Sequence, residues 1–295
     1  MNEKEAKADL DDLIQRLGLR EGDRVMLGID MGKIPLPGYE AELSRHGLRE
    51  RRAKWCQFVL DVLLNHITPN GTLLVPSFSY SCSKPNSRFI LEETPSENGP
   101  FTEFLRSQPG VIRSLHPLFS LLGMGHDAEK LLGDIGRSAF GAMSPFSRFA
   151  GEGVKFLSLG VELRNCITYG HHLEQTYGCP HRYNKAFRPV VSASGKLLSG
   201  EWYAYVAYRN LDYSADFSTL QIALNASGDL VEADWRGNAN HLVETDAVDK
   251  VGYELLRQDS SAFVDRDISL RFDDSEPQRN SDPNQTSLKI TVGQL

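Results

Sequence analysis

Apolar positions in the first 190 residues follow two alternating patterns, one typical of helices and one typical of strands. Spacings of three and four place Leu10, Leu13, Ile14 and Leu17 on one helical face, and the same spacing returns over residues 55–67. Short apolar runs between the helices predict buried strands at Arg24–Ile29, Thr72–Val75, Leu118–Met124 and Val154–Val161. This alternation predicts an α/β fold: a three-layer αβα sandwich with a mainly parallel central sheet.

The pattern changes after Pro189. Residues 202–208 (WYAYVAY) read as an aromatic strand, so we expect a smaller antiparallel C-terminal extension. We interpret residues 1–265 as one domain, with a subdomain edge near residue 190. Residues 266–295 read as a polar C-terminal tail with weak strand signals at Ile268–Phe272 and Leu288–Val292.

The segment from Ser77 to Pro100 is rich in Ser, Pro, Asn and Glu, and Pro76 marks the end of the strand before it. It is interpreted as a long loop. Loops of this length inside a compact domain are usually functional or disordered.

Composition narrows the class of protein. The 32 Lys and Arg residues against 39 Asp and Glu residues give a net charge of −7, so nucleic acid is not an expected partner. No apolar run reaches the roughly 20 residues that cross a bilayer, and the first residues hold no hydrophobic signal segment. Four cysteines without a CxxC pair form no disulfide framework. We expect a reduced, cytoplasmic protein with no membrane partner.

The densest polar cluster, residues 168–174 (TYGHHLE), follows the strand Val154–Val161. Thr168 suits a helix N-cap and Gly178 a helix end. Residues three apart share a helix face, so His171 and Glu174 are predicted to meet, and a carboxylate there would orient an imidazole base. A capped helix in which both residues only stabilise the first turn would show the same spacing.

His172 lies about 100° around the helix from His171 and is interpreted as structural or substrate-facing. A metal site would have to be drawn from Cys166, His171, His172, Cys179 and His181. That spacing matches no familiar zinc site, and we expect no metal.

Two further segments are candidates for ligand contacts. One is residues 113–117 (RSLHP), which would also suit an ordinary connecting loop; the other is the loop Ile29–Lys33, at the carboxyl end of the first strand, where open α/β sheets bind ligands. The chain contains no dinucleotide, phosphate-loop or serine-nucleophile motif in these places.

Taken together, these segments resemble the aminoglycoside 3-N-acetyltransferase family, which does not have the GNAT fold. The resemblance covers roughly residues 8 to 260 and is carried by an ordered series: residues 109–117 with Ser120, residues 141–146 (GAMSPF), Val154–Val161, the pattern Thr168-x-x-His171-x-x-Glu174, and residues 237–239. One departure is the loop after the first strand, where the family has serines and this chain reads Gly28-Ile29-Asp30-Met31-Gly32.

The resemblance implies transfer of an acyl group from acetyl-CoA to an amine. His171 matches the general base and Glu174 the carboxylate beside it. Asp216 is favoured as a further acid of a triad-like arrangement, with Asp212 a close competitor. The remaining assignments are donor contacts from Asp30, Met31, Gly32, Lys33, Ser77, Ser79, Arg113, Ser114 and His116, and acceptor contacts from His172, Tyr80 and Asp212.

The resulting hypothesis is a CoA-dependent N-acyltransferase that acts on an aminoglycoside or amino sugar by direct transfer. Backbone N–H groups of residues 29–33 or 77–80 would stabilise the thioester oxyanion. The alternatives are an amino-sugar or sugar-nucleotide N-acyltransferase of surface polysaccharide or secondary metabolism, a zinc hydrolase, and an inactive ligand-binding homologue. A homodimer is left open.

Overall fold

The computed structural model of the chain describes residues 3–34, 45–208, 213–265, 270–271 and 291–292. Its α-helices are α1 (Glu3–Leu17), α2 (Arg45–Ile67), α3 (Pro100–Arg106), α4 (Ala128–Leu132), α5 (Gly170–Tyr177), α6 (Ser218–Ser227) and α7 (Thr245–Gln258). Its strands are β1 (Arg24–Ile29), β2 (Thr72–Phe78), β3 (Arg88–Ile90), β4 (Ile112–Arg113), β5 (Phe119–Gly125), β6 (Val154–Leu159), β7 (Arg182–Phe187), β8 (Val190–Ala193), β9 (Lys196–Leu198), β10 (Trp202–Ala207), β11 (Val231–Trp235), β12 (Asn238–Glu244), β13 (Leu270–Arg271) and β14 (Thr291–Val292).

The large sheet has the order β11-β12-β6-β1-β2-β5-β4. Its centre is parallel, because β1 pairs in parallel with both β6 and β2. The strands added on either side, β12 beside β6 and β5 beside β2, are antiparallel. The α/β class with a parallel centre is thus confirmed. Strand β5 is antiparallel to β2 because it begins at the edge of the sheet where β2 ends, with Phe119 opposite Phe78.

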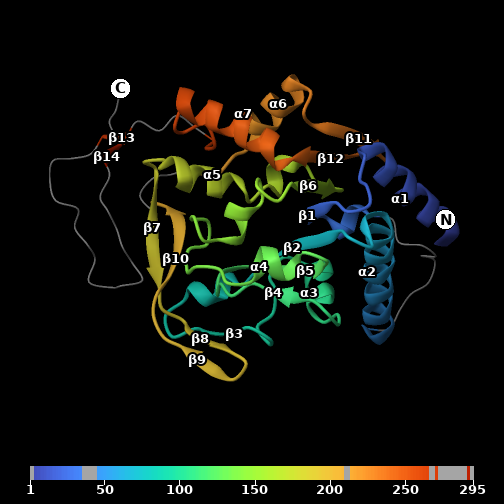
Figure 1. The fold of residues 1–295 in the computed structure, drawn as a ribbon, viewed down its shortest axis with the longest axis horizontal. Coiled ribbons are helices and arrows are strands. Elements are labelled where there is room, and N and C mark those ends of the chain that lie inside the picture. The colour runs from blue at the N-terminus through green and yellow to red at the C-terminus, as the bar shows by residue number, and fades with distance from the viewer. Residues whose placement is uncertain (1–2, 35–44, 209–212, 266–269, 272–290, 293–295) are drawn as a thin grey trace.

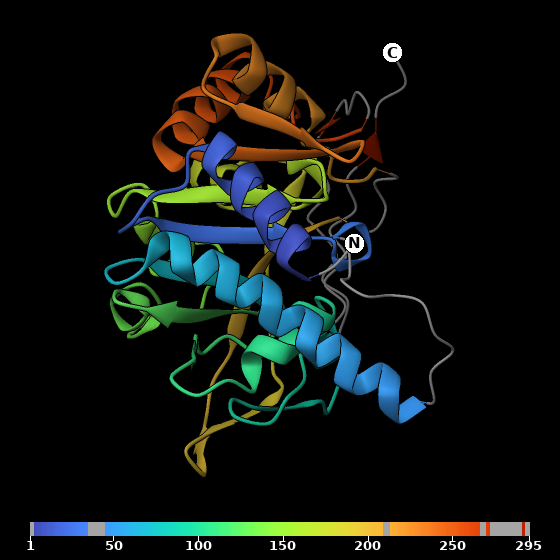
Figure 2. The ribbon, with the colours of Figure 1, turned by 90° about the vertical axis from the view of Figure 1, so that its right-hand side faces the viewer.

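Helices cover both faces of the sheet, as the three-layer prediction requires (Figures 1 and 2). On one face α1 and α2 bury the predicted apolar stripe, including Leu10 and Ile14, against Val25 and Leu157. On the other face α5, α6 and α7 pack on strand residues such as Phe156. The sheet side chains alternate between the two cores because successive residues of a strand point to opposite faces. In the described part of the chain no helix is long and apolar enough to span a bilayer.

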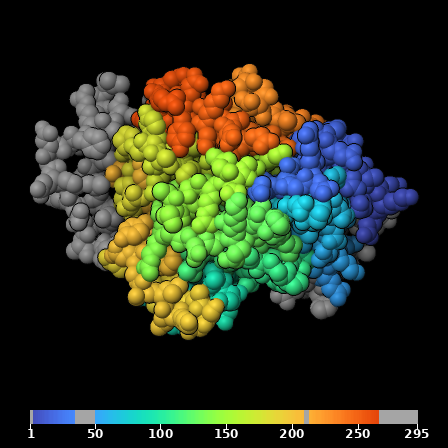
Figure 3. Space-filling view, viewed as in Figure 1, coloured from blue at the N-terminus to red at the C-terminus, as the bar shows by residue number. Residues whose placement is uncertain are grey.

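Two small sheets extend the sandwich. The aromatic strand β10 pairs antiparallel with β7, as predicted for the C-terminal extension, whereas β8 pairs antiparallel with β9 and parallel with β3. Phe187 and Trp202 belong to the same apolar core as Phe140, so this core contains residues from both sides of position 190. The space-filling view shows the middle of the chain between the N-terminal and C-terminal helices (Figure 3).

The interpretation of the Pro76 region was wrong in two respects. Strand β2 continues through Pro76 to Phe78. Strand β1 pairs with β2 only as far as Leu74, so at Pro76 there is no β1 residue to accept a hydrogen bond, and the N–H that proline lacks costs little. The segment Ser77–Pro100 also contains a short strand, β3, which the polar composition concealed.

Gly28, near the end of β1, tests how tightly the first strand is packed. A Cβ atom there would lie 2.5 Å from both Cβ and Sγ of Cys166, so no side chain fits without displacing the segment after β6. We expect Gly28→Ala to lower the free energy of unfolding by about 1–3 kcal/mol, the usual cost of overpacking.

Denaturant unfolding measures this change. The matched control is Gly151→Ala, because the nearest atom to an added Cβ there is 4.0 Å away and the control should stay close to the parent. Equal stability of the two variants would contradict the packing argument.

Candidate active site

A cavity of about 280 Å³ opens where β2 ends and β5 begins, at the carboxyl edge of the parallel strands. Ligands in open α/β folds bind at this edge. The cavity is lined by Phe78, Tyr80, Phe119, Phe140, Thr168, His171, Arg182, Tyr205, Val206 and Ala207. Its wall is largely aromatic: Phe119 contacts Tyr80 and Phe140, and the Phe140 ring lies 5.5 Å from that of His171.

Helix α5 brings His171 to this cavity together with Glu174. Nδ1 of His171 lies 2.7 Å from Oε2 of Glu174, so the predicted contact of residues three apart on one helix face is present. The His171 side chain is 21% exposed and that of Glu174 is fully buried. Because the carboxylate accepts, Nδ1 donates, which leaves the lone pair of the neutral ring on Nε2.

The Glu174 carboxylate has two further partners. His181 donates from Nε2 to Oε1 at 2.9 Å, and Nε of Arg182 lies 2.8 Å from Oε2. Burial alone would raise the pKa of Glu174, but the hydrogen bonds from His171 and His181 and the positive charge of Arg182 outweigh it and lower the pKa to about 2. The carboxylate is therefore ionised across the neutral range.

The His171 ring is held in its neutral form. Burial lowers its pKa from 6.5, and the hydrogen bond to Glu174 only partly opposes that shift. The rings of Phe140 and Phe217 flank it at 5.5 and 5.3 Å. A neutral imidazole with Nδ1 fixed by a carboxylate is the arrangement of a general base.

The first turn of α5 differs from the predicted cap. The helix begins at Gly170 and the side chain of its N-cap residue, Tyr169, makes no capping bond. Thr168 instead lines the cavity, and its carbonyl accepts from the His171 N–H at 3.0 Å. The predicted end is confirmed, with Gly178 in the left-handed conformation at φ 85°.

His172 is turned away from this group. Its Nδ1 lies 2.6 Å from the Phe140 carbonyl, its ring packs against Tyr169 at 5.1 Å, and its side chain is buried. Burial lowers its pKa. The structure supports the structural interpretation of His172 and does not bring it to the cavity as an acceptor contact.

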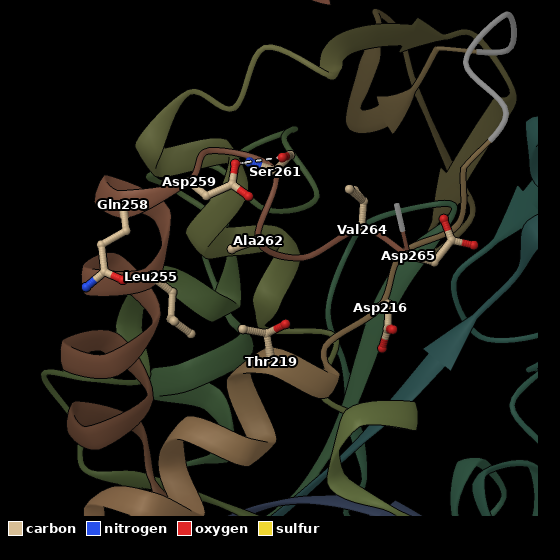
Figure 4. A pocket seen from close by; sticks show the side chains of 9 residues that line it. All are labelled: Asp216, Thr219, Leu255, Gln258, Asp259, Ser261, Ala262, Val264 and Asp265. Carbon is tan, nitrogen blue, oxygen red and sulfur yellow. Dashed lines mark hydrogen bonds between the residues drawn. The ribbon is translucent and has the colours of Figure 1, made fainter. Parts of the chain in front are cut away.

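Asp216 is not brought together with His171 or Glu174. Its carboxylate accepts from the N–H and hydroxyl of Ser218 at the start of α6, and these bonds lower its pKa. Figure 4 shows it on a separate groove between α6 and the end of α7, with Thr219 and Asp265. The Glu174 carboxylate is contacted instead by two basic side chains, His181 and Arg182. Asp212 lies outside the described residues.

Arg113, Ser114 and His116 are used inside the protein and not on a ligand surface. The Arg113 guanidinium donates to the carbonyl of Ser77 and the hydroxyls of Ser79 and Ser120. Ser114 accepts from the Leu121 N–H. His116 is 1% exposed, its Nδ1 accepts from Leu118 and Phe119, and burial lowers its pKa to about 4. For these three side chains to contact an acyl donor, they would first have to break the hydrogen bonds described above.

Residues 77–80 present Phe78 and Tyr80 to the cavity. Tyr80 is 48% exposed and lines it. Ser77 and Ser79 are fully buried, Ser79 donates to the Pro95 carbonyl, and its N–H is bonded to Leu118. Neither serine therefore reaches the cavity, and the Ser79 N–H is not a free oxyanion donor.

The turn after β1 is similarly occupied. The Asp30 carboxylate accepts from the Gly32 N–H, and the N–H groups of Asp30 and Lys33 are bonded to the carbonyls of Leu159 and Asp30. Met31 is buried in the α1–α2 core. Lys33 packs close to Gly160. These residues lie at the carboxyl end of β1, at the edge of the sheet that also bears the cavity, without lining it.

Sequence reasoning missed Arg182 and considered His181 only as a metal ligand. Both lie in the turn and strand after α5, too far along the chain for helix spacing to connect them with Glu174. The available signal was the Glu174 carboxylate itself, because a carboxylate that becomes buried requires partners. Within the described ranges no group of three or more His, Cys, Asp or Glu could hold a metal ion.

Two cysteines lie on either side of α5 and are packed against other groups. Cys166 packs against Gly28, and Cys179 is fully buried two residues before His181. Burial raises the pKa of each thiol to about 12.

The geometry can now be compared with known proteins. Among curated relatives, aminoglycoside N(3)-acetyltransferase III of Pseudomonas aeruginosa is 26% identical over 93% of this chain and 97% of its own length. Aminoglycoside N(3)-acetyltransferase VIII of Streptomyces fradiae is 35% identical over 63% of this chain and 66% of its own.

Solved structures show the same fold. Aminoglycoside acetyltransferase AAC(3)-Xa superposes with a TM-score of 0.70 at 22% identity, over 88% of this chain and 93% of its own. A binary complex of AAC-IIIb with CoASH gives 0.70 at 20% identity, over 88% and 97%. The model of the aminoglycoside 3-N-acetyltransferase family matches residues 41–256, which include α5 and its cavity. The chain belongs to the aminoglycoside 3-N-acetyltransferase family, as its ordered motifs predicted.

Proposed function

We propose that the protein transfers an acyl group, acetyl in the simplest case, from a CoA thioester to an amine of an aminoglycoside or amino sugar, with His171 as general base. The observation that carries this proposal is the 2.7 Å bond between His171 Nδ1 and the buried Glu174, placed at a cavity in a chain of this family. Relatives named as N-acetyltransferases and a similar structure that holds CoASH support the donor class.

The mechanism follows from the ring's protonation state. A lysine-like amine with a pKa of about 10.4 is mostly protonated at neutral pH and must lose a proton to attack. The ammonium loses one proton to solvent before the attack, and Nε2 of neutral His171 accepts a second proton from the nitrogen as it attacks the thioester carbonyl, while Glu174 holds the ring. The C–N bond forms, the C–S bond breaks, and the proton passes from His171 to the departing thiolate. No acyl-enzyme is formed.

A second acceptor class deserves a direct comparison, because of the cavity lining. Its described residues include several aromatic rings and one permanently charged side chain, the cation Arg182, and no carboxylate. Aromatic rings suit the apolar face of a sugar ring, which aminoglycosides and amino sugars both present. An amino-sugar or sugar-nucleotide acceptor therefore stays the second candidate. Separately from the acceptor, the association of two copies of the chain into a homodimer remains a prediction.

Replacing the base should remove the activity without affecting the fold. We expect His171→Ala to lose about 10²–10⁴ in kcat, the range of a general-base contribution, measured by release of free CoA thiol. The matched control is His172→Asn, whose amide can still donate to the Phe140 carbonyl, and it should retain near-normal turnover. A His171→Ala variant that turns over at the parental rate would exclude this base.

The pH profile should have its acid limb below 6.5. Activity requires neutral His171, and burial lowers its pKa, so kcat should fall only as the pH drops through that lowered value. Glu174, with a pKa of about 2, stays ionised throughout and adds no second limb there. An acid limb of kcat with its midpoint clearly above pH 6.5 would contradict a His171 ring that burial keeps neutral.

The acceptor class can be settled by a screen for thiol release. With acetyl-CoA as donor, we expect kanamycin- or gentamicin-type amines to give a higher kcat/KM than amino sugars or their nucleotides, because the relatives are named for aminoglycosides. The reverse order would favour the amino-sugar or sugar-nucleotide acceptor.

A further inference from the structure

Arg182 is a buried cation that reaches the catalytic pair from a different element. It begins β7, its side chain is 7% exposed, and its Nε lies 2.8 Å from Oε2 of Glu174. That oxygen is the one that accepts from His171 Nδ1. The guanidinium and the imidazole therefore share one carboxylate oxygen and stand close enough to repel each other when both are charged.

The charges that act on His171 come from three places. Helix α5 contributes Glu174, the turn before β7 contributes His181, and β7 contributes Arg182. The rings that pack on His171 from the other side, Phe140 and Phe217, carry no charge. With His171 neutral, the negative charge of Glu174 is balanced by the positive charge of Arg182 within the buried group.

This balance matters because an ionised carboxylate buried without a counter-ion is costly. Glu174 would then recover its charge balance from an imidazole that can take up a proton, and two are in contact with it: His171 at 2.7 Å and His181 at 2.9 Å. A protonated His171 could not act as a base. The arrangement thus needs a permanent cation, and guanidinium remains charged at every working pH.

We propose that Arg182 is a positioning residue: it neutralises Glu174, so that the carboxylate orients His171 through Nδ1 without drawing a proton onto the ring. The inference rests on the proposed function and deepens it. It also accounts for the release of the proton later, because protonation of His171 leaves the group with a net positive charge, which favours donation to the thiolate.

The test follows the protonation of His171 directly, by NMR titration of its ring, beside the pH profile of kcat. In Arg182→Gln we expect the His171 pKa and the acid limb to rise by about one pH unit or more. Arg182→Lys, which keeps the charge, should stay near the parent. Arg188→Met is the matched control, since it removes a positive charge that pairs with Glu201 outside the site.

A double variant keeps the proposal testable if the single one does not fold. Arg182→Gln with Glu174→Gln removes both charges of the pair, and replacing a buried ion pair as a whole is tolerated better than breaking it. Its His171 pKa should return to the parental value or lower. A titration unchanged in Arg182→Gln, or one still raised in the double variant, would overturn the proposal. Because the titration needs no turnover, it is decided separately from the acyl transfer itself.

Discussion

The buried carboxylate of Glu174 is the constraint on which the site depends. A charge removed from water must be paired and hydrogen-bonded, and here the partners come from α5 itself, from the following turn and from β7. The same contacts attach the β7–β10 pair to the sandwich, and β10 supplies Tyr205 to the cavity. Satisfying one side chain thus fixes the imidazole and places one wall of the cavity.

The mixed sheet explains why residues far apart in sequence meet at one edge. Strands β1, β6 and β2 run in parallel and deliver their following loops to the same end. The antiparallel β5 begins at that end, so Phe119 stands opposite Phe78 beside the cavity. An all-parallel sheet would have placed the beginning of β5 at the opposite edge.

Prediction from sequence was successful where the governing forces were local. Apolar spacing located α1 and β1, and helix geometry joined His171 to Glu174. It failed where a contact depends on tertiary packing: nothing in the spacing of Asp216 reveals that its carboxylate is used by Ser218. The polar appearance of Arg113 and His116 suggested ligand contacts. Instead Arg113 donates to the Ser77 carbonyl near the end of β2, and His116 accepts from the Phe119 N–H at the start of β5. The contact of Arg182 with Glu174 could not be predicted from spacing, because the two residues lie on different elements separated by a turn.

The thiols near the site have a chemical consequence for an enzyme that handles activated acyl groups. Burial raises the pKa of the Cys166 and Cys179 thiols, so both stay protonated at neutral pH. Thiolates are the side chains that thioester exchange would modify first. These two cysteines are therefore poor targets for self-acylation.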